Sequence, residues 1–264
     1  MDLSHLRFII IAVGLAVALF AGMMFMLDAG RRIALRQIEL HGPDARIGVG
    51  IVDGAVYAML ALLIGFSFSG AATRFDARRA LVAREVNAVG NAWRFIDLLP
   101  SDAQGPLRDG FRRYLDALIA SYTTPTINRQ QALLEPPDVA RAEADIWSHA
   151  VASVLTPSGE RARVLLLPSL DDMFSIVLEE RLARRIHPPL VIYAMLAVTA
   201  LAAALFAGYG VASKSIRNWV FMIGIAATVS MAVFVVIELE YPRLGLIRVT
   251  DMDRALEELR ATMH

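Results

Sequence analysis

Cysteine is absent from the 264-residue sequence. Disulfide bonds, thiolate catalysis and cysteine-ligated zinc or iron–sulfur centres are therefore excluded. Histidine is scarce, and no histidine has a second one at the spacing that metal ligands need. The five histidines are His5, His41, His149, His187 and His264. We expect them to lie in solvent or at interfaces, and we expect neither a metal nor a cofactor.

Signatures of catalysis are absent as well. The chain has no G-x-S-x-G, Walker A, G-x-G-x-x-G or H-E-x-x-H motif, so the sequence does not predict an enzyme. Basic and acidic side chains balance, 26 against 26. No bulk field therefore favours nucleic acid as a partner. No stretch alternates apolar and polar residues with period two over a useful length, which predicts an all-α protein.

Long apolar blocks are what the sequence has in abundance. Hydrophobic residues make up 56% of the chain, and the mean hydropathy is +0.52. Four blocks are close to the roughly 20 residues that a transmembrane helix needs: Phe8–Leu27, Ile51–Ala72, Leu190–Ala212 and Trp219–Ile237. The first block is longer than the ~7–15 apolar residues of a signal peptide and lacks a convincing A-x-A cleavage site. We therefore expect four retained transmembrane helices.

Basic residues near the ends of the spans predict the orientation, because cytoplasmic loops carry the excess of Lys and Arg. One side of the membrane would carry Arg31, Arg32, Arg36, Arg46, Lys214 and Arg217. The other side carries a larger set that includes Arg74, Arg78, Arg79, Arg181, Arg184, Arg185, Arg243 and Arg248. We therefore expect both termini and the central region in the cytoplasm.

The spans divide the chain into four expected parts. Residues 1–72 would form the first two transmembrane helices, joined by a short external linker, Asp28–Gly50, with a turn signal at Gly42-Pro43-Asp44. Residues 73–187 would form a helical cytosolic region, and residues 188–240 the third and fourth transmembrane helices. Residues 241–264 would form a cytosolic tail that contains one amphipathic helix.

The cytosolic region shows helical periodicity interrupted by proline. Breaks are expected at Pro100, Pro125, Pro136 and residues 156–159, and a kink or break at Pro168. The apolar residues that we expect to face inward are Phe75, Val82, Val86, Val89, Trp93, Ile96, Phe111, Leu115, Leu118, Ile119, Ile146, Trp147, Val151 and Val154. Two acidic pairs, Asp171-Asp172 and Glu179-Glu180, are interpreted as a solvated face that pairs with nearby arginines.

The second span carries the most informative pattern. Ala58, Leu62 and Phe66 recur every four residues and therefore share one helix face. Small residues follow, at Gly65, Ser67, Ser69, Gly70, Ala71 and Ala72. One interpretation is a tightly packed helix bundle, which sequence physics alone favours because small residues let membrane helices approach closely. The other is a symmetric constriction, with one copy of the face from each subunit of a ring.

Charged residues lie at the inner ends of two spans. Arg74, Arg78 and Arg79 follow the second span, either snorkelling to the headgroups or forming a ring of cations that attracts anions. Glu238 and Glu240 end the fourth span. Acids at membrane depth usually find partners, so we expect an ion pair with Arg74, Arg78 or Arg243 rather than a proton relay.

Two segments of the second span resemble the bestrophin family of pentameric ion channels. They are Leu63-Ile-Gly-Phe66 and Arg74-Phe75-Asp-Ala-Arg78, and Asn87 and Arg94 continue the similarity. A bacterial bestrophin-like group is more similar, from about residue 50 onward. Its typical segments stand here as Phe68-Ser-Gly-Ala-Ala-Thr-Arg-Phe-Asp-Ala-Arg-Arg79, Leu165-Leu-Leu-Pro168, His187-Pro-Pro-Leu190 and Glu238-Leu-Glu-Tyr-Pro-Arg-Leu-Gly245.

The resemblance implies a pore neck and also shows where this chain departs from it. Phe66 matches the innermost neck position of bestrophins, and Leu62 and Ala58 match the two positions above it. Alanine at the outer position implies a wider neck there. Asp76 replaces the second aromatic residue of the family's arginine–aromatic motif, and the acidic calcium clasp of animal bestrophins has no counterpart in the tail.

By resemblance, the chain is expected to be a homopentameric ion channel of the bacterial inner membrane. Its partners would be other copies of itself, the lipid bilayer and permeant ions, with anions such as chloride favoured over cations. The alternative is a non-conducting membrane protein whose cytosolic helices act as a sensor or docking platform.

Overall fold

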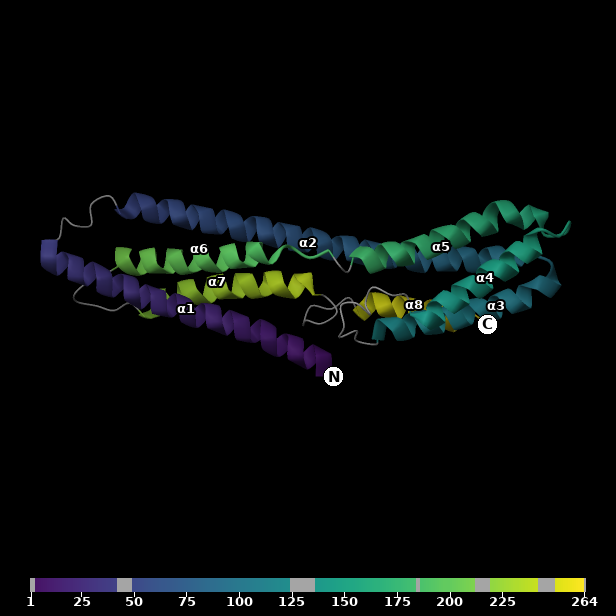
Figure 1. Cartoon of the computed structure of the whole chain (residues 1–264), viewed down its shortest axis with the longest axis horizontal. Helices are drawn as coiled ribbons and strands as arrows, with labels where there is room; N and C mark the ends of the chain where they lie inside the picture. Colours follow the sequence, from purple (N-terminus) through teal and green to yellow (C-terminus); the bar gives the residue numbers. More distant parts are fainter. Residues whose placement is uncertain are drawn as a thin grey trace. The chain divides into compact units, whose positions relative to one another are not determined.

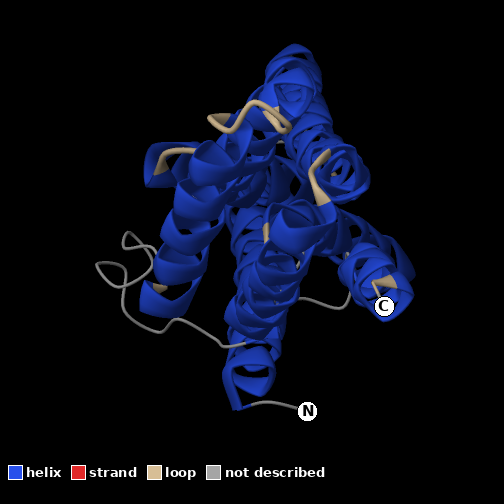
Figure 2. Ribbon diagram, turned by 90° about the vertical axis from the view of Figure 1, so that its right-hand side faces the viewer, coloured by secondary structure: helices blue, strands red, loops and turns tan. Residues whose placement is uncertain are grey.

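The computed structural model describes residues 3–41, 49–123, 136–183, 186–211, 219–241 and 250–263. Helices and short connections account for all of these residues, and no strand occurs among them (Figure 2). The helices are α1 (Leu3–His41), α2 (Val49–Phe95), α3 (Ser101–Thr123), α4 (Pro137–Val154), α5 (Arg163–Ala183), α6 (Leu190–Gly210), α7 (Trp219–Glu240) and α8 (Thr250–Thr262). Two single 3-10 turns, η2 (Ile96–Leu98) and η4 (Glu160–Ala162), precede α3 and α5. The all-α prediction is confirmed.

Four of these helices, α1, α2, α6 and α7, are long and apolar enough to cross a membrane, as the sequence predicts. The first differs at its end. The predicted linker starts at Asp28, whereas α1 stays helical to His41. Nothing in this stretch breaks a helix before Gly42-Pro43, and Asp28 pairs with Arg32 one turn later at 2.7 Å. The predicted turn at Gly42-Pro43-Asp44 lies outside the described residues.

The chain forms two compact units. The first comprises Met1–Phe75 and His187–Ile247, and the second comprises Asp76–Ile186 and Arg248–His264. The helix α2 is uninterrupted and contributes residues to both, with the division at Phe75.

In the first unit, α1 runs beside both α6 and α7 (Figure 1). The contact is lined by methionine, leucine and alanine: Met23, Leu27, Ala200, Ala203, Ala204 and Ala207. Two glycines bring the backbones of α1 and α6 together. A Cβ atom on Gly30 would overlap the carbonyl oxygen of Leu205, and one on Gly208 would overlap that of Leu27. Small residues permit this close packing, which drives helix association in membranes.

The second unit has an apolar core of its own. Its largest fully buried side chains include Ile96, Leu107, Phe111, Tyr114, Leu115, Leu118, Ile146, Leu166, Leu170 and Met173. The predicted inward positions are mostly buried or packed against this core, but the prediction for Trp147 is wrong, because its side chain is 42% exposed. Pro168 does not break its helix, since α5 continues through it to Ala183.

The acidic pair at Glu179-Glu180 does not form one solvated face, so that interpretation is wrong for Glu180. Glu180 is buried on the same side of α5 as Met173, Ile176 and Val177, as the i, i+3, i+4, i+7 spacing requires. Only Glu179 is exposed, and it pairs with Arg84 on α2 at 3.2 Å.

Candidate functional site

The face of α2 that carries Ala58, Leu62 and Phe66 is uncovered in the described structure. Leu62 is 57% exposed and Phe66 is 68% exposed, and Ala58 is also exposed. The other side of the same helix is packed, with Leu60 and Ala71 buried in apolar clusters of the first unit. One side of α2 therefore packs against other helices of the same chain. The opposite side is left to contact another molecule, lipid or water.

The uncovered face continues past the apolar residues. Ser69 and Thr73 are exposed positions on the same side of the helix, and the steps 58, 62, 66, 69 and 73 are each close to one helical turn. At about 100° per residue, these five positions lie within an arc of about 80° on the helix. We call these five residues the conduit face. Along it, the side chains change from apolar to hydroxyl.

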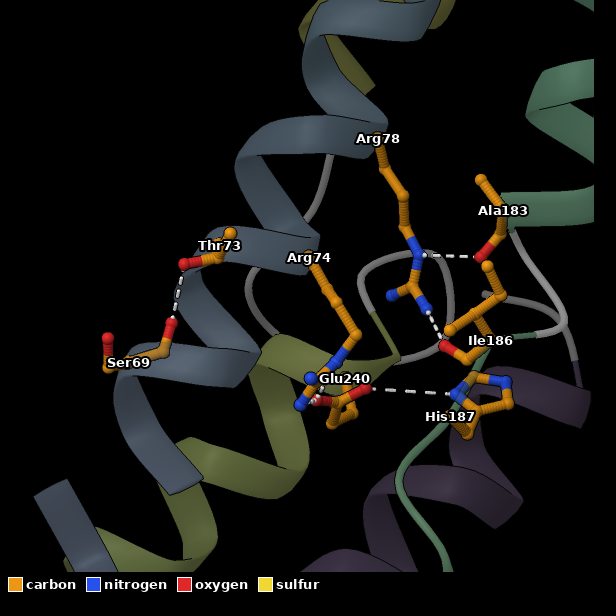
Figure 3. Close-up of polar contacts among 8 residues, drawn as sticks. All are labelled: Ser69, Thr73, Arg74, Arg78, Ala183, Ile186, His187 and Glu240. Atoms are coloured by element: carbon orange, nitrogen blue, oxygen red, sulfur yellow. Dashed lines mark hydrogen bonds and ion pairs between the residues drawn. The ribbon is translucent and has the colours of Figure 1, made fainter. Parts of the chain in front are cut away.

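One hydroxyl of this face has a defined partner. Thr73 Oγ1 donates to the carbonyl oxygen of Ser69 at 2.8 Å. Figure 3 shows both residues on one side of α2, with Arg74 turned to the other side. With its proton engaged in this bond, the Thr73 oxygen presents lone pairs outward.

Arg74 is held by a buried carboxylate on α7. Its Nε donates to Glu240 Oε1 at 2.8 Å, and a second guanidinium nitrogen contacts the same oxygen. The Glu240 side chain is fully buried. This is one of the ion pairs that the sequence predicts for Glu238 and Glu240, and it joins the middle of α2 to the C-terminal end of α7 (Figure 3).

His187 completes the surroundings of Glu240. Its Nδ1 lies 3.8 Å from Glu240 Oε2, and its ring stacks on Tyr241 with 4.7 Å between ring centroids. From the sequence, His187 is expected only to lie in solvent or at an interface, and its contact with Glu240 is not predicted. The sequence does show that His187 lies directly before Pro188-Pro189, at the start of α6. In the structure, this position lies beside the C-terminal end of α7.

Arg78 has different partners and belongs to the second unit. It is buried, and it donates to the carbonyl oxygens of Ala183 at 3.4 Å and Ile186 at 3.0 Å. Arginine near a helix C-terminus commonly satisfies the last carbonyl groups, here that of Ala183 at the end of α5 and that of Ile186 just beyond it. Glu238, the remaining charged site residue, is buried on α7. The structure therefore brings Arg74 and Glu240 together and gives Arg78 a separate role.

No group of three or more His, Asp or Glu side chains with metal-binding geometry occurs among the described residues. These features define a class: a helical membrane protein with four apolar spans, in which one long helix exposes a face that passes from apolar to hydroxyl side chains.

A model of the bestrophin-like domain matches residues 34–253, and the chain therefore belongs to the bestrophin-like family. This confirms the resemblance found in the sequence. A search of curated proteins finds no match.

Solved structures agree with this assignment. The chain is similar to a crystal structure of a bacterial bestrophin homologue from Klebsiella pneumoniae carrying a point mutation, with a TM-score of 0.67, 15% identity, and coverage of 94% of this chain and 99% of that chain. A second point mutant from the same organism gives a TM-score of 0.62 at 17% identity, covering 93% and 99%. A crystal structure described as a membrane protein gives 0.63 at 16%, covering 91% and 99%. At such identities these similarities show the bestrophin fold.

Proposed function

We propose that identical copies of this chain assemble into a ring, pentameric as in the bestrophins that the sequence resembles, and that ions cross the membrane along its axis. Each copy turns its conduit face toward the axis, and Ala58, Leu62 and Phe66 form an apolar neck. Hydrophobic constrictions of this kind close by dewetting. The membrane is the bacterial inner membrane, with both termini in the cytoplasm, as the distribution of basic residues predicts.

The observation that carries the proposal is the exposure of Leu62 and Phe66 on a helix whose other side is packed. Apolar exposure alone also fits a surface in contact with lipid. The same face, however, continues into Ser69 and Thr73. Apolar and polar residues on the same side of one uninterrupted helix are expected where that side lines a water-filled pore along its length.

Selectivity for anions stays a prediction from the sequence. That prediction rests on the arginines that follow the second span, which would form a cluster of positive charge at the cytoplasmic mouth of the pore. In the structure, Arg74 is paired with Glu240 and Arg78 is buried against main-chain oxygens. Neither guanidinium belongs to the conduit face in this arrangement.

The neck is tested by replacing Phe66 with alanine. Phe66→Ala removes the largest side chain of the neck, so the single-channel conductance in planar bilayers should rise several-fold. The matched control is Phe68→Ala, the same change at an exposed position of α2 that lies off the conduit face. It should leave the conductance near that of the unmodified protein.

Two results would count against the neck. Equal conductance for Phe66→Ala and the unmodified protein would remove Phe66 from the pore wall. Absence of any current from purified, intact assemblies would instead favour the alternative, a non-conducting sensor or docking protein.

A further inference from the structure

A buried carboxylate in the first unit joins α2, α7 and the segment that precedes α6. Glu240 Oε1 accepts from Arg74 of α2, and Glu240 Oε2 lies 3.8 Å from Nδ1 of His187 (Figure 3). We propose that His187 is a proton-sensitive latch, which in its protonated form pairs with Glu240 and ties the start of α6 to the end of α7. The latch itself needs no pore, and only its effect on current rests on the proposed function.

The distance between Nδ1 of His187 and Oε2 of Glu240 makes this contact depend on charge. A hydrogen bond from a nitrogen to an oxygen spans about 2.7–3.2 Å, so a neutral His187 gains none from Glu240 at 3.8 Å. A charged ring at the same distance attracts the carboxylate, most strongly where water screens it least. The Glu240 side chain is 0% exposed and that of His187 is 27% exposed. A proton from water can therefore reach His187, while the charge that it would face is shielded from solvent.

The His187 ring is held in place by its neighbours. It stacks on Tyr241 with 4.7 Å between ring centroids and 22° between the planes, and Tyr241 in turn contacts Phe8 of α1 at 5.0 Å. The backbone after His187 is restricted by Pro188 and Pro189, and Pro189 begins α6 with a φ of −56°. Attraction of the ring toward Glu240 is therefore passed to the start of α6.

Arg74 and His187 approach different oxygens of Glu240, so the two contacts do not exclude each other. Arg74 Nε donates to Oε1 at 2.8 Å, whereas His187 faces Oε2. Protonation of His187 therefore adds a second cation to the carboxylate that holds Arg74. Arg74 directly follows Thr73 of the conduit face, so the latch acts on the same carboxylate that fixes this part of α2.

The charged and titratable groups on the surrounding elements differ from His187 in where they titrate. Histidine changes charge between about pH 5 and 8, whereas arginines such as Arg74, and Arg7 beside Phe8 on α1, stay charged, and tyrosines such as Tyr241 and Tyr193 of α6 stay neutral. Glu238, the other buried acid of α7, points about 160° away from Glu240 around the helix. The latch should therefore be closed at the acid end of this range and released as the pH rises through it.

The test is thermal unfolding of the full-length protein in mild detergent at about pH 5.5 and about pH 8. The unfolding midpoint of the unmodified protein should exceed that of His187→Gln by about 2–4 °C more at the acid pH than at the alkaline pH. His187→Lys, which stays charged at both values, should exceed His187→Gln by the same margin at both.

A matched control is His149→Gln, which removes an exposed histidine of α4 whose Nδ1 lies 2.8 Å from the carbonyl oxygen of Asp145. Its midpoint should follow the pH as that of the unmodified protein does. Size-exclusion chromatography of each variant confirms that the assembly is intact. A midpoint that responds to pH equally in His187→Gln and in the unmodified protein would overturn the latch.

The effect on current is tested separately in planar bilayers. The current of the unmodified protein should change between the two pH values, and that of His187→Gln should not. An equal response in both proteins would overturn the link between the latch and the pore. Absence of current from the unmodified protein, with its pH-dependent stability intact, would overturn the proposed function and leave the latch in place.

Discussion

At the scale of single residues, Glu240 is a buried charge in the first unit that needs a partner of opposite charge. It is a fully buried carboxylate whose Oε1 accepts two contacts from Arg74 and whose Oε2 faces His187. A buried carboxylate is costly unless it is paired, and removal of one partner leaves an uncompensated charge. The pair therefore fixes Arg74, and with it the middle of α2, against α7.

Arg74→Ala should destabilise the protein strongly, by about 3–5 kcal/mol, because Glu240 would keep its burial and lose the charge-assisted hydrogen bonds from Arg74. Arg84→Ala is the contrast on the same helix. The Arg84–Glu179 pair is exposed, with side chains 55% and 52% accessible, so its loss should cost only about 0–1 kcal/mol. Thermal unfolding in detergent measures both, and equal midpoints for the two variants would contradict the role given to Glu240.

The sequence could predict that an ion pair forms here, but not all of the residues that take part in the contact. Acids at the end of an apolar span next to several arginines already indicate an ion pair. His187 joins only because the segment before α6 passes beside the end of α7, which depends on tertiary packing. Glu180 was misplaced for a related reason, since two adjacent acids on a helix point about 100° apart and only one of them faced solvent.

At the scale of helices, the crossing of α1 and α6 depends on glycine. Gly30 and Gly208 each place a backbone carbonyl of the other helix where a side chain would otherwise be. Without a hydrophobic driving force between helices in lipid, such close packing contributes much of the association. The neighbouring alanines of α6, Ala200, Ala203, Ala204 and Ala207, continue the contact.

Gly30→Ala should therefore separate α1 from α6 and lower the unfolding temperature or the yield of folded protein. Gly14→Ala is the control on the same helix, because nothing lies within 4 Å of the added methyl group. That variant should keep the original stability. Folded yield after membrane extraction and the unfolding midpoint are the measurements, and a tolerated Gly30→Ala would show that the crossing can relax.

The sequence predicted which segments form helices better than it predicted where each helix begins and ends. The four spans follow from hydropathy, and α4 begins at Pro137 as the proline signal indicates. The continuation of α1 to His41 was missed because the apolar block ends at Leu27 and the linker was placed from Asp28 onward. Polarity ends a span, but only a breaker such as Gly42-Pro43 ends a helix.

At the scale of the whole molecule, one chain cannot enclose a pore with a single helix. Leu62 and Phe66 lie on the uncovered side of α2, and a conduit needs copies of that side around an axis. Closed cyclic symmetry is the usual form of such assemblies. The sequence gives the periodicity of this face, but what covers it depends on the assembly, which no pattern within one chain encodes directly.

The protein in mild detergent should therefore have the mass of about five subunits, and its mass should be independent of dilution over the range in which it stays folded. Native mass spectrometry, with multi-angle light scattering as a check that accounts for bound detergent, gives the number of copies. A monomer would rule out a pore built from α2. A ring of a different size would keep the pore and change only its radius.

The unbroken course of α2 also limits which insertions and deletions the gene can tolerate. One extra residue between Phe66 and Ser69 would turn everything beyond it by about 100° and advance it by about 1.5 Å. Arg74 would then no longer meet Glu240 while Leu62 kept its original direction. Insertions and deletions in this stretch should therefore be selected against, even where substitutions are tolerated. Homologous proteins should keep its length more strictly than its amino-acid sequence.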